Sequence, residues 1–212
     1  MMQQLLVYAD SLSWGIIPLT RNRLSFEQRW PGVLEIGLRE RGKNVRVIED
    51  CLNGRRTLYE DPIKDGRNGL IGLQQRIEIN SPLEMVLLML GTNDFQANHN
   101  HNASHATFGL KQLIASIRSA PIEPGMPIPK ILVIAPPTIQ TPKGNIAQKF
   151  KDADKKSIGL ATSFVELSKQ EGCYFFDAGT VTQSSKIDGV HLDADQHKVL
   201  GLALVNYLEK LL

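Results

Sequence analysis

The chain of 212 residues is long enough for one sizeable domain with its own core. Its 42% hydrophobic and 22% charged residues are ordinary for a globular protein, and a net charge of only +2 argues against a nucleic-acid partner. No apolar run approaches the ~18 residues that a membrane span needs. Residues 1–4 lack a signal-peptide pattern, so we expect a cytoplasmic protein unless a signal has been removed.

Five short apolar runs are predicted to be strands. Each is about five residues long, and continuous apolarity rather than alternation indicates strands that are covered on both faces. The runs are Leu5–Ala9, Val45–Glu49, Met85–Leu90, Ile131–Ala135 and Tyr174–Asp177.

Amphipathic segments separate these runs and are predicted to be helices. They cover Trp30–Arg41, Asn68–Ile79, Ser104–Ser119, Asn145–Lys169 and the segment that follows Asp193. Asp193 and Gln196 have the spacing of a capping box, which predicts the start of the last helix. This alternation of strands and helices predicts an α/β protein with a parallel sheet of about five strands and helices on both faces. No linker or repeat interrupts residues 1–212, which predicts a single domain.

Basic residues gather in two places but are interpreted as solvated surface. One group is Arg39, Arg41, Lys43 and Arg46, and the other is Lys149, Lys151, Lys155 and Lys156. No aromatic residues alternate with them to stack on bases, so neither group predicts a nucleic-acid site.

Histidines and cysteines do not form a pattern that predicts a metal site. His99, His101 and His105 occur in a polar tract with no carboxylate pattern nearby, which favours a surface loop. Cys51 and Cys173 have no zinc-binding spacing and are predicted to be buried free thiols rather than a disulfide. No metal and no cofactor is expected.

Polar residues follow four of the predicted strands. Asp10-Ser11 follows the first, Asn53-Gly54 the second, and Gly91-Thr92-Asn93-Asp94 the third, while the loop after the fifth ends in Asp188-Gly189-Val190-His191. Because parallel strands end at one edge of the sheet, these four groups are predicted to meet there.

The chemistry of the four groups fits acyl transfer. Ser11 is a nucleophile that needs a base, and His191 can be that base. Asp188, three residues earlier, can orient the imidazole. Asp10 is the rival acid, but adjacent side chains on an extended chain point apart, so Asp10 is assigned a structural role in the turn.

An oxyanion hole is predicted from the backbone N–H groups of Ser11 and Gly54 and the side-chain amide of Asn93. Each residue alone has a simpler explanation, since Ser11 could cap a helix, Asn53-Gly54 is a common turn and a lone His191 is often structural. These simpler explanations do not account for the position of all four groups at strand ends.

The four groups resemble the four blocks of the SGNH (GDSL) hydrolase family, whose Ser, Gly, Asn and His fall on Ser11, Gly54, Asn93 and His191. Asp10–Gly15 and Met89–Asp94 are most similar to the bacterial arylesterase and acyltransferase branch of EstA-type esterases. The first block departs from the family in having Ala9 where Gly is usual. The resemblance implies a flavodoxin-like three-layer α/β/α fold and metal-free ester hydrolysis.

The function expected from this resemblance is a serine esterase that cleaves short-chain aryl or alkyl esters through an acyl-enzyme, with water or another alcohol as acceptor. Trp14, Ile16 and Phe95 adjoin the blocks and are predicted to line the substrate pocket. Two other functions stay open: a metal-dependent phosphoesterase that uses the same carboxylates and His191, and a binding module without catalysis. The sequence also leaves open a homo-oligomer in which a neighbouring subunit walls the site.

Overall fold

The computed structural model describes residues 2–212 and has a five-stranded parallel sheet at its centre. The strands are β1 (Gln3–Ala9), β2 (Val45–Cys51), β3 (Met85–Met89), β4 (Lys130–Ala135) and β5 (Tyr174–Asp177). Their order in the sheet is β2-β1-β3-β4-β5. All five predicted strands are confirmed, and their ends differ from the prediction by two residues or fewer.

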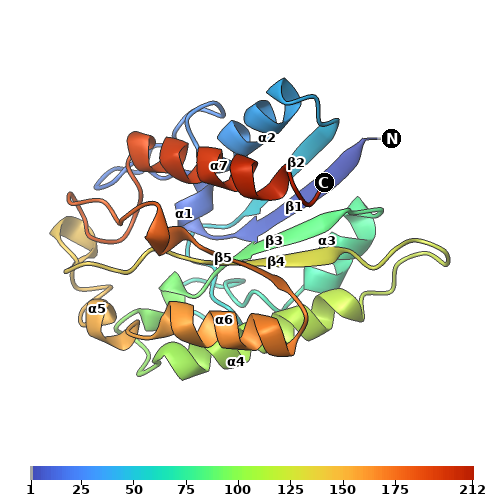
Figure 1. Ribbon diagram of the computed structural model, residues 1–212. Helices are drawn as coiled ribbons and strands as arrows, with labels where there is room; N and C mark the ends of the chain where they lie inside the picture. The colour runs from blue at the N-terminus through green and yellow to red at the C-terminus, as the bar shows by residue number, and fades with distance from the viewer. Residues whose placement is uncertain (1) are drawn as a thin grey trace.

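Helices cover both faces of this sheet, as Figure 1 shows. One face carries α1 (Ser11–Trp14), α2 (Trp30–Glu40) and α7 (Ala194–Leu208). The other carries α3 (Leu73–Asn80), α4 (Ala103–Arg118), α5 (Ala153–Lys156) and α6 (Leu160–Gln170). Three short 3-10 helices are η1 (Thr92–Phe95), η2 (Gly144–Ile146) and η3 (Ala178–Thr180). The three-layer α/β/α architecture is therefore confirmed.

The central strands are apolar throughout because both of their faces are buried. Along β1, Leu6 and Tyr8 pack into the cluster beneath α4 and α6, while Leu5 and Val7 pack into the cluster beneath α2 and α7. All four side chains are at most 2% exposed. Burial of apolar surface on both sides of one sheet holds the two helical layers together.

The predicted helix Asn145–Lys169 is wrong as a single element, because the backbone turns left-handed twice within it. Asp152 has φ +60 and Gly159 has φ +83, and these residues separate η2, α5 and α6. A left-handed residue cannot continue a right-handed helix. The predicted helix at Asn68–Ile79 also begins late, at Leu73, because Asn68 forms a β-bridge with Arg56 and residues 69–72 form turns. The start of α7 agrees with the prediction, and Gln196 Oε1 accepts the Asp193 N–H at 2.7 Å.

The strand order places a switch point between β1 and β3, where ligands of open α/β sheets bind beyond the carboxyl ends of the strands. The segments that follow these two strands carry Asp10-Ser11 and Asn93-Asp94. Within the part of the chain that the structure describes, none of the helices is both long and apolar enough to cross a membrane. Cys51 and Cys173 are free thiols, as predicted, but both are half-buried rather than buried.

Candidate active site

Ser11 is presented by an abrupt change from strand to helix at the carboxyl end of β1. Asp10 caps α1, since its Oδ1 accepts the Leu12 N–H at 2.9 Å. Ser11 is then the first residue of a single helical turn, which Gly15 ends in the left-handed conformation. The predicted role of Asp10 in fixing this turn agrees with these contacts. The Ser11 side chain consequently faces the rim of the sheet.

His191 and Asp188 come from the loop before α7 and meet Ser11 across 180 positions of sequence. His191 Nε2 lies 3.2 Å from Ser11 Oγ, and His191 Nδ1 lies 2.6 Å from Asp188 Oδ2. Asp188 Oδ1 also accepts the backbone N–H groups of Val190 and His191, each at 2.9 Å. The structure therefore brings together the three side chains that the sequence grouped, in the order hydroxyl, imidazole, carboxylate.

Gly189 makes the short loop between Asp188 and His191 possible. Its φ is +80, which side chains rarely allow, and a Cβ there would lie 2.4 Å from the Thr141 carbonyl oxygen. The tight turn lets Asp188 reach the imidazole three residues later.

The charge state of Asp188 is set by opposing effects. Burial raises the pKa of the Asp188 carboxyl, but the hydrogen bond and charge of His191, with the two backbone amides, outweigh burial and hold the pKa below its usual range. Asp188 is therefore an anion at neutral pH, suited to fix the imidazole tautomer and to stabilise a positive charge on it.

Asn93 is held rigidly in η1, directly after β3. Its Nδ2 donates to Asp10 Oδ2 at 3.0 Å and to the Arg55 carbonyl oxygen at 3.1 Å, and its Oδ1 accepts from Gln96 Nε2 at 2.7 Å. The side chain is 2% exposed, yet it reaches the same cavity as Ser11. These three hydrogen bonds fix the orientation of the Asn93 side-chain amide, with its nitrogen directed toward Asp10, the residue before Ser11.

The other two predicted oxyanion donors are backbone amides. Gly54 lies in a turn closed by the Arg55 N–H and the Leu52 carbonyl, with φ +85. Among residues 2–212, neither the Ser11 N–H nor the Gly54 N–H donates to a protein acceptor. Both residues line the cavity, so these amides are available to a bound oxygen.

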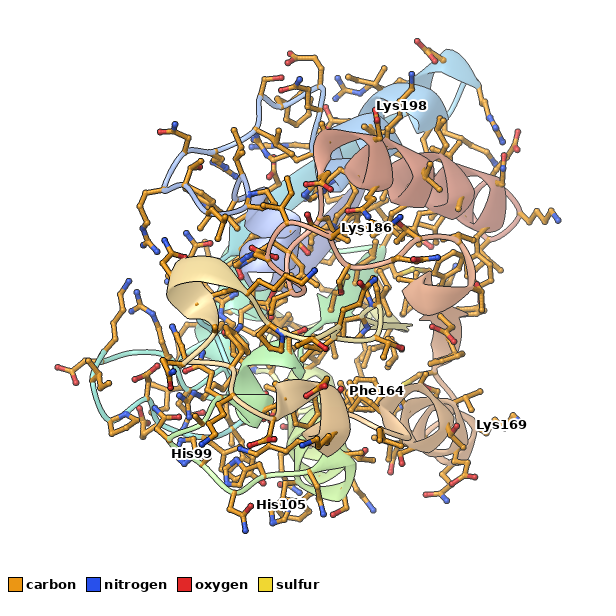
Figure 2. All side chains as sticks on the ribbon, turned by 90° about the vertical axis from the view of Figure 1, so that its left-hand side faces the viewer. His99, His105, Phe164, Lys169, Lys186 and Lys198 are labelled. Carbon is orange, nitrogen blue, oxygen red and sulfur yellow. The ribbon has the colours of Figure 1, made fainter. Side chains whose placement is uncertain are left out.

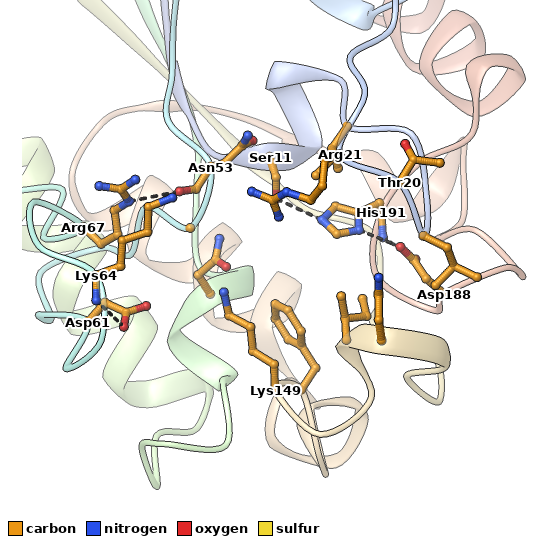
Figure 3. A pocket seen from close by; sticks show the side chains of 17 residues that line it. Ser11, Thr20, Arg21, Asn53, Asp61, Lys64, Arg67, Lys149, Asp188 and His191 are labelled. Atoms are coloured by element: carbon orange, nitrogen blue, oxygen red, sulfur yellow. Dashed lines mark hydrogen bonds and ion pairs between the residues drawn. The ribbon is translucent and has the colours of Figure 1, made fainter.

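The cavity in front of Ser11 has a volume of about 300 Å³ (Figure 3). Its apolar wall is formed by Ile16, Leu19, Ile146 and Phe150. Ile16 was predicted to line it, but the residues from the loops that follow β4 were not, because the path of those loops could not be derived from the sequence. The volume suits a small substrate.

Trp14 and Phe95 were predicted to line the substrate pocket, but neither lines this cavity. Trp14 ends α1 and lies against the Arg23 guanidinium, whose carbon is 4.9 Å from the ring centroid. Phe95 is 0% exposed and packs in the core on the α4 and α6 side of the sheet. Proximity to Ser11 and Asn93 in the sequence did not determine the direction of these side chains.

Four basic residues also line the cavity and were missed as site residues. They are Arg21, Lys64, Arg67 and Lys149, and Figure 3 shows them around the space in front of Ser11 and His191. Lys149 had been interpreted as solvated surface, and the other three carried no recognisable motif. They come together only because three separate loops converge.

The histidine tract lies at the edge of the molecule, where Figure 2 labels His99 and His105. The ring centroids of His99 and His101 are 4.6 Å apart, and those of His101 and His105 are 5.0 Å apart. The prediction of a surface loop is confirmed for His99 and His101, whereas His105 lies in the first turn of α4 and contributes to its capping box; all three residues are half-buried or exposed. Among residues 2–212, no group of three or more His, Cys, Asp or Glu side chains is placed to hold a metal ion.

The class of protein follows from comparison with known families. Residues 10–199 match the model of the GDSL-like lipase/acylhydrolase family, which spans all four blocks of the site. The chain belongs to this family and is an ester hydrolase by class. The resemblance seen in the four sequence blocks is thereby confirmed.

Individual solved structures resemble the chain over almost its whole length. An aryl esterase of M. smegmatis in an inhibitor-bound form is 30% identical, with 99% of this chain and 100% of that one covered and a TM-score of 0.93. Est24, a carbohydrate acetylesterase from Sinorhizobium meliloti, is 30% identical with the same coverage and a TM-score of 0.92. A protein of Agrobacterium tumefaciens str. C58 is 35% identical, again over 99% and 100%, with a TM-score of 0.91. No protein with a curated description matches this chain.

Proposed function

We propose that this protein is a serine esterase that cleaves short-chain carboxylic esters through an acyl-enzyme, with residues 1–212 acting as one catalytic domain. The observation that carries the proposal is the continuous contact from Ser11 Oγ to His191 Nε2, at 3.2 Å, and from His191 Nδ1 to Asp188 Oδ2, at 2.6 Å. A hydroxyl, an imidazole and an anionic carboxylate in this order form an activated nucleophile.

In the first step, Ser11 Oγ attacks the ester carbonyl carbon while His191 Nε2 accepts the hydroxyl proton. Asp188 stabilises the imidazolium that forms and keeps Nδ1 protonated. His191 then gives its proton to the leaving alcohol, and the acyl group stays on Ser11. Water or a second alcohol, deprotonated by His191, releases the acyl group and restores the enzyme.

The negative charge that develops on the carbonyl oxygen is assigned to three donors. Ser11 and Gly54 line the cavity, and their N–H groups have no protein acceptor among the described residues. Asn93 would share an amide hydrogen between the oxyanion and its present acceptors, Asp10 and the Arg55 carbonyl. Donors that are already oriented stabilise the transition state without reorganisation.

The substrate class is inferred from the size of the cavity and from similar enzymes. A volume of about 300 Å³ walled by Ile16, Leu19 and Phe150 suits a short acyl group better than a long alkyl chain. The similarity to a carbohydrate acetylesterase of S. meliloti supports a small acyl group, and the similarity to an aryl esterase of M. smegmatis supports an aryl leaving group. Acyl transfer to an alcohol would use the same acyl-enzyme and differs only in the acceptor.

A series of 4-nitrophenyl esters tests the proposal. Acetate and butyrate should be hydrolysed with a much higher kcat/KM than octanoate and dodecanoate, the rate should persist in EDTA, and Ser11→Ala should abolish it while the circular dichroism spectrum is retained. Adding an alcohol as acceptor and measuring the transferred ester separates hydrolysis from transfer. Loss of activity in EDTA, with recovery on adding a divalent metal, would favour the metal-dependent alternative.

A further inference from the structure

The basic residues that line the cavity come from three separate loops. Arg21 belongs to the segment between α1 and α2, Lys64 and Arg67 to the segment between β2 and α3, and Lys149 to the segment before α5. Figure 3 shows their side chains around one space, with Lys64 and Arg67 at the left, Lys149 below, and Arg21 near Ser11 and His191. A chain with a net charge of only +2 therefore places four cationic groups at its nucleophile.

These four cations have no acidic partners of their own. Within residues 2–212, Arg21, Lys64, Arg67 and Lys149 form no ion pair with a carboxylate, although eleven other pairs join arginine or lysine to an acid.

The two acids that line the cavity are already engaged. Asp61 pairs with the buried Arg56 at 3.2 Å, and Asp188 is bonded to His191. The cavity therefore has an excess of positive charge that the protein does not neutralise.

The cations also affect one another electrostatically. Partial burial lowers the pKa of Lys149; Asp61 raises it, whereas the positive charges of Arg56, Lys64 and Arg21 lower it further. Arg21, Lys64 and Lys149 are exposed at the mouth of this hollow, and a cleft lined by one sign of charge raises the local concentration of ions of the opposite sign.

Arg67 links this charge to the oxyanion turn. Its Nε donates to the Asn53 carbonyl oxygen at 3.1 Å, and one of its terminal nitrogens donates to the Asp65 carbonyl at 2.6 Å. Asn53 directly precedes Gly54, so the guanidinium is anchored beside a proposed oxyanion donor. A substrate could place an anionic group here and its ester carbonyl at Ser11 only if a few bonds separate the two groups.

We propose that the preferred substrates of this esterase carry a carboxylate group, which binds the cavity cations Arg21, Lys64, Arg67 and Lys149 while Ser11 attacks the ester. The inference rests on the proposed function, because it assigns the substrate class of the same site. Arginine and lysine bind carboxylates through charge-assisted hydrogen bonds, and a binding group next to the reacting carbonyl orients it.

Two matched substrate pairs test the inference and show which side of the ester carries the anion. On the acyl side, 4-nitrophenyl hemiglutarate is compared with its neutral methyl ester. On the alcohol side, 4-acetoxybenzoate is compared with methyl 4-acetoxybenzoate. On the acyl side the leaving group is the same, so kcat/KM values are compared directly after subtraction of the spontaneous rate, which the free carboxylate of the hemiglutarate itself accelerates. On the alcohol side each kcat/KM is divided by the rate of spontaneous hydrolysis, which corrects for the different leaving groups. We expect the charged member to be favoured about tenfold or more in at least one pair at low salt, and the preference to decline as salt screens the charges.

Variants then attribute the preference to the cavity. Lys149→Met and Arg21→Met should each reduce the charged-to-neutral ratio about three- to tenfold, and the double variant should reduce it further. Lys169→Met removes an exposed cation from the end of α6 and is the matched control, whose ratio should equal that of the wild type.

A ratio near or below one in both pairs, or a ratio that the double variant leaves unchanged, would overturn the inference. In those cases the neutral esters are still hydrolysed and the proposed function stands. If no ester of either pair is hydrolysed, the proposed function fails instead. Calorimetric titration of monomethyl glutarate into Ser11→Ala then tests the anion-binding site separately from catalysis. Binding that is weakened by adding Lys149→Met would support the site, and no binding would oppose it.

Discussion

The Asn93 side-chain amide donates a hydrogen bond of 3.0 Å to the Asp10 carboxylate, which joins the segment after β3 to the segment after β1. The other Asp10 oxygen accepts the Leu12 N–H that begins α1. Asp10 therefore contacts both the helical turn that presents Ser11 and the side chain proposed as an oxyanion donor, and it makes no hydrogen bond to His191. We assign Asp10 a positioning role and Asp188 the role of the acid that orients the base.

Exchanging each acid for its amide separates these roles. Asp188→Asn should lower kcat about 10³–10⁴-fold, because an amide neither fixes the His191 tautomer nor stabilises its positive charge. Asp10→Asn should lower kcat by at most about 10²-fold, since it disturbs one oxyanion donor. Initial rates on 4-nitrophenyl acetate measure both effects, with retained circular dichroism as the control. A larger loss in Asp10→Asn than in Asp188→Asn would show that Asp10 orients the base.

Removing the Asn93 donor should affect the chemical step more than binding. Asn93→Ala should lower kcat about 10²–10³-fold with little change in KM, because the oxyanion is bound in the transition state and not in the ground state. Asn44→Ala changes an exposed asparagine at the opposite end of the sheet and should leave kcat unaltered. An Asn93→Ala variant with wild-type kcat would remove Asn93 from the oxyanion hole.

Asp94, fully buried next to Asn93, should make the stability of the fold depend on pH. Burial raises the pKa of its carboxyl to about 7, and hydrogen bonds from Thr57 oppose this only in part. The unfolded pKa is about 4. The contribution of Asp94 to the free energy of unfolding is therefore complete below about pH 4 and is lost as the pH rises toward 7.

Burial also lowers the pKa values of His101 and His197, to about 4 and about 3, and these two groups make the protein more stable as the pH rises over the same range. The test therefore compares Asp94→Asn with the wild type, because the histidine contribution is common to both proteins. The stability of the wild type relative to the variant should fall by on the order of 3 kcal/mol between pH 4 and pH 7 in urea unfolding. Curves of unfolding free energy against pH that run parallel for the two proteins would contradict the raised pKa of the Asp94 carboxyl.

Much of the fold and the grouping of the site followed from the sequence for a simple physical reason. A strand buried on both faces must be apolar along its length, so polar residues such as Ser11 and Asn93 mark the point where it ends. Parallel strands end at one edge, which brings these residues together without knowledge of the loops. Asp188 could be grouped with His191 because only two residues of a tight turn separate them.

The parts that could not be predicted depend on local backbone geometry and on loops. The left-handed conformation of Asp152, which breaks the helix predicted at Asn145–Lys169, has no strong sequence signal. Trp14 and Phe95 were placed in the substrate pocket from their proximity in sequence, but helix geometry and core packing turn them elsewhere. Lys149 joins the cavity only through the path of a loop, which no periodic pattern describes.

Labelling with an organophosphonate ester tests the central claim most directly, because phosphonylation requires a serine that His191 activates beneath oriented donors. Mass spectrometry of the intact protein should show one adduct, and peptide mapping should place it on Ser11, with no adduct in Ser11→Ala. His191→Ala should slow the labelling sharply. An unlabelled wild-type protein, or an adduct on a residue other than Ser11, would contradict the account.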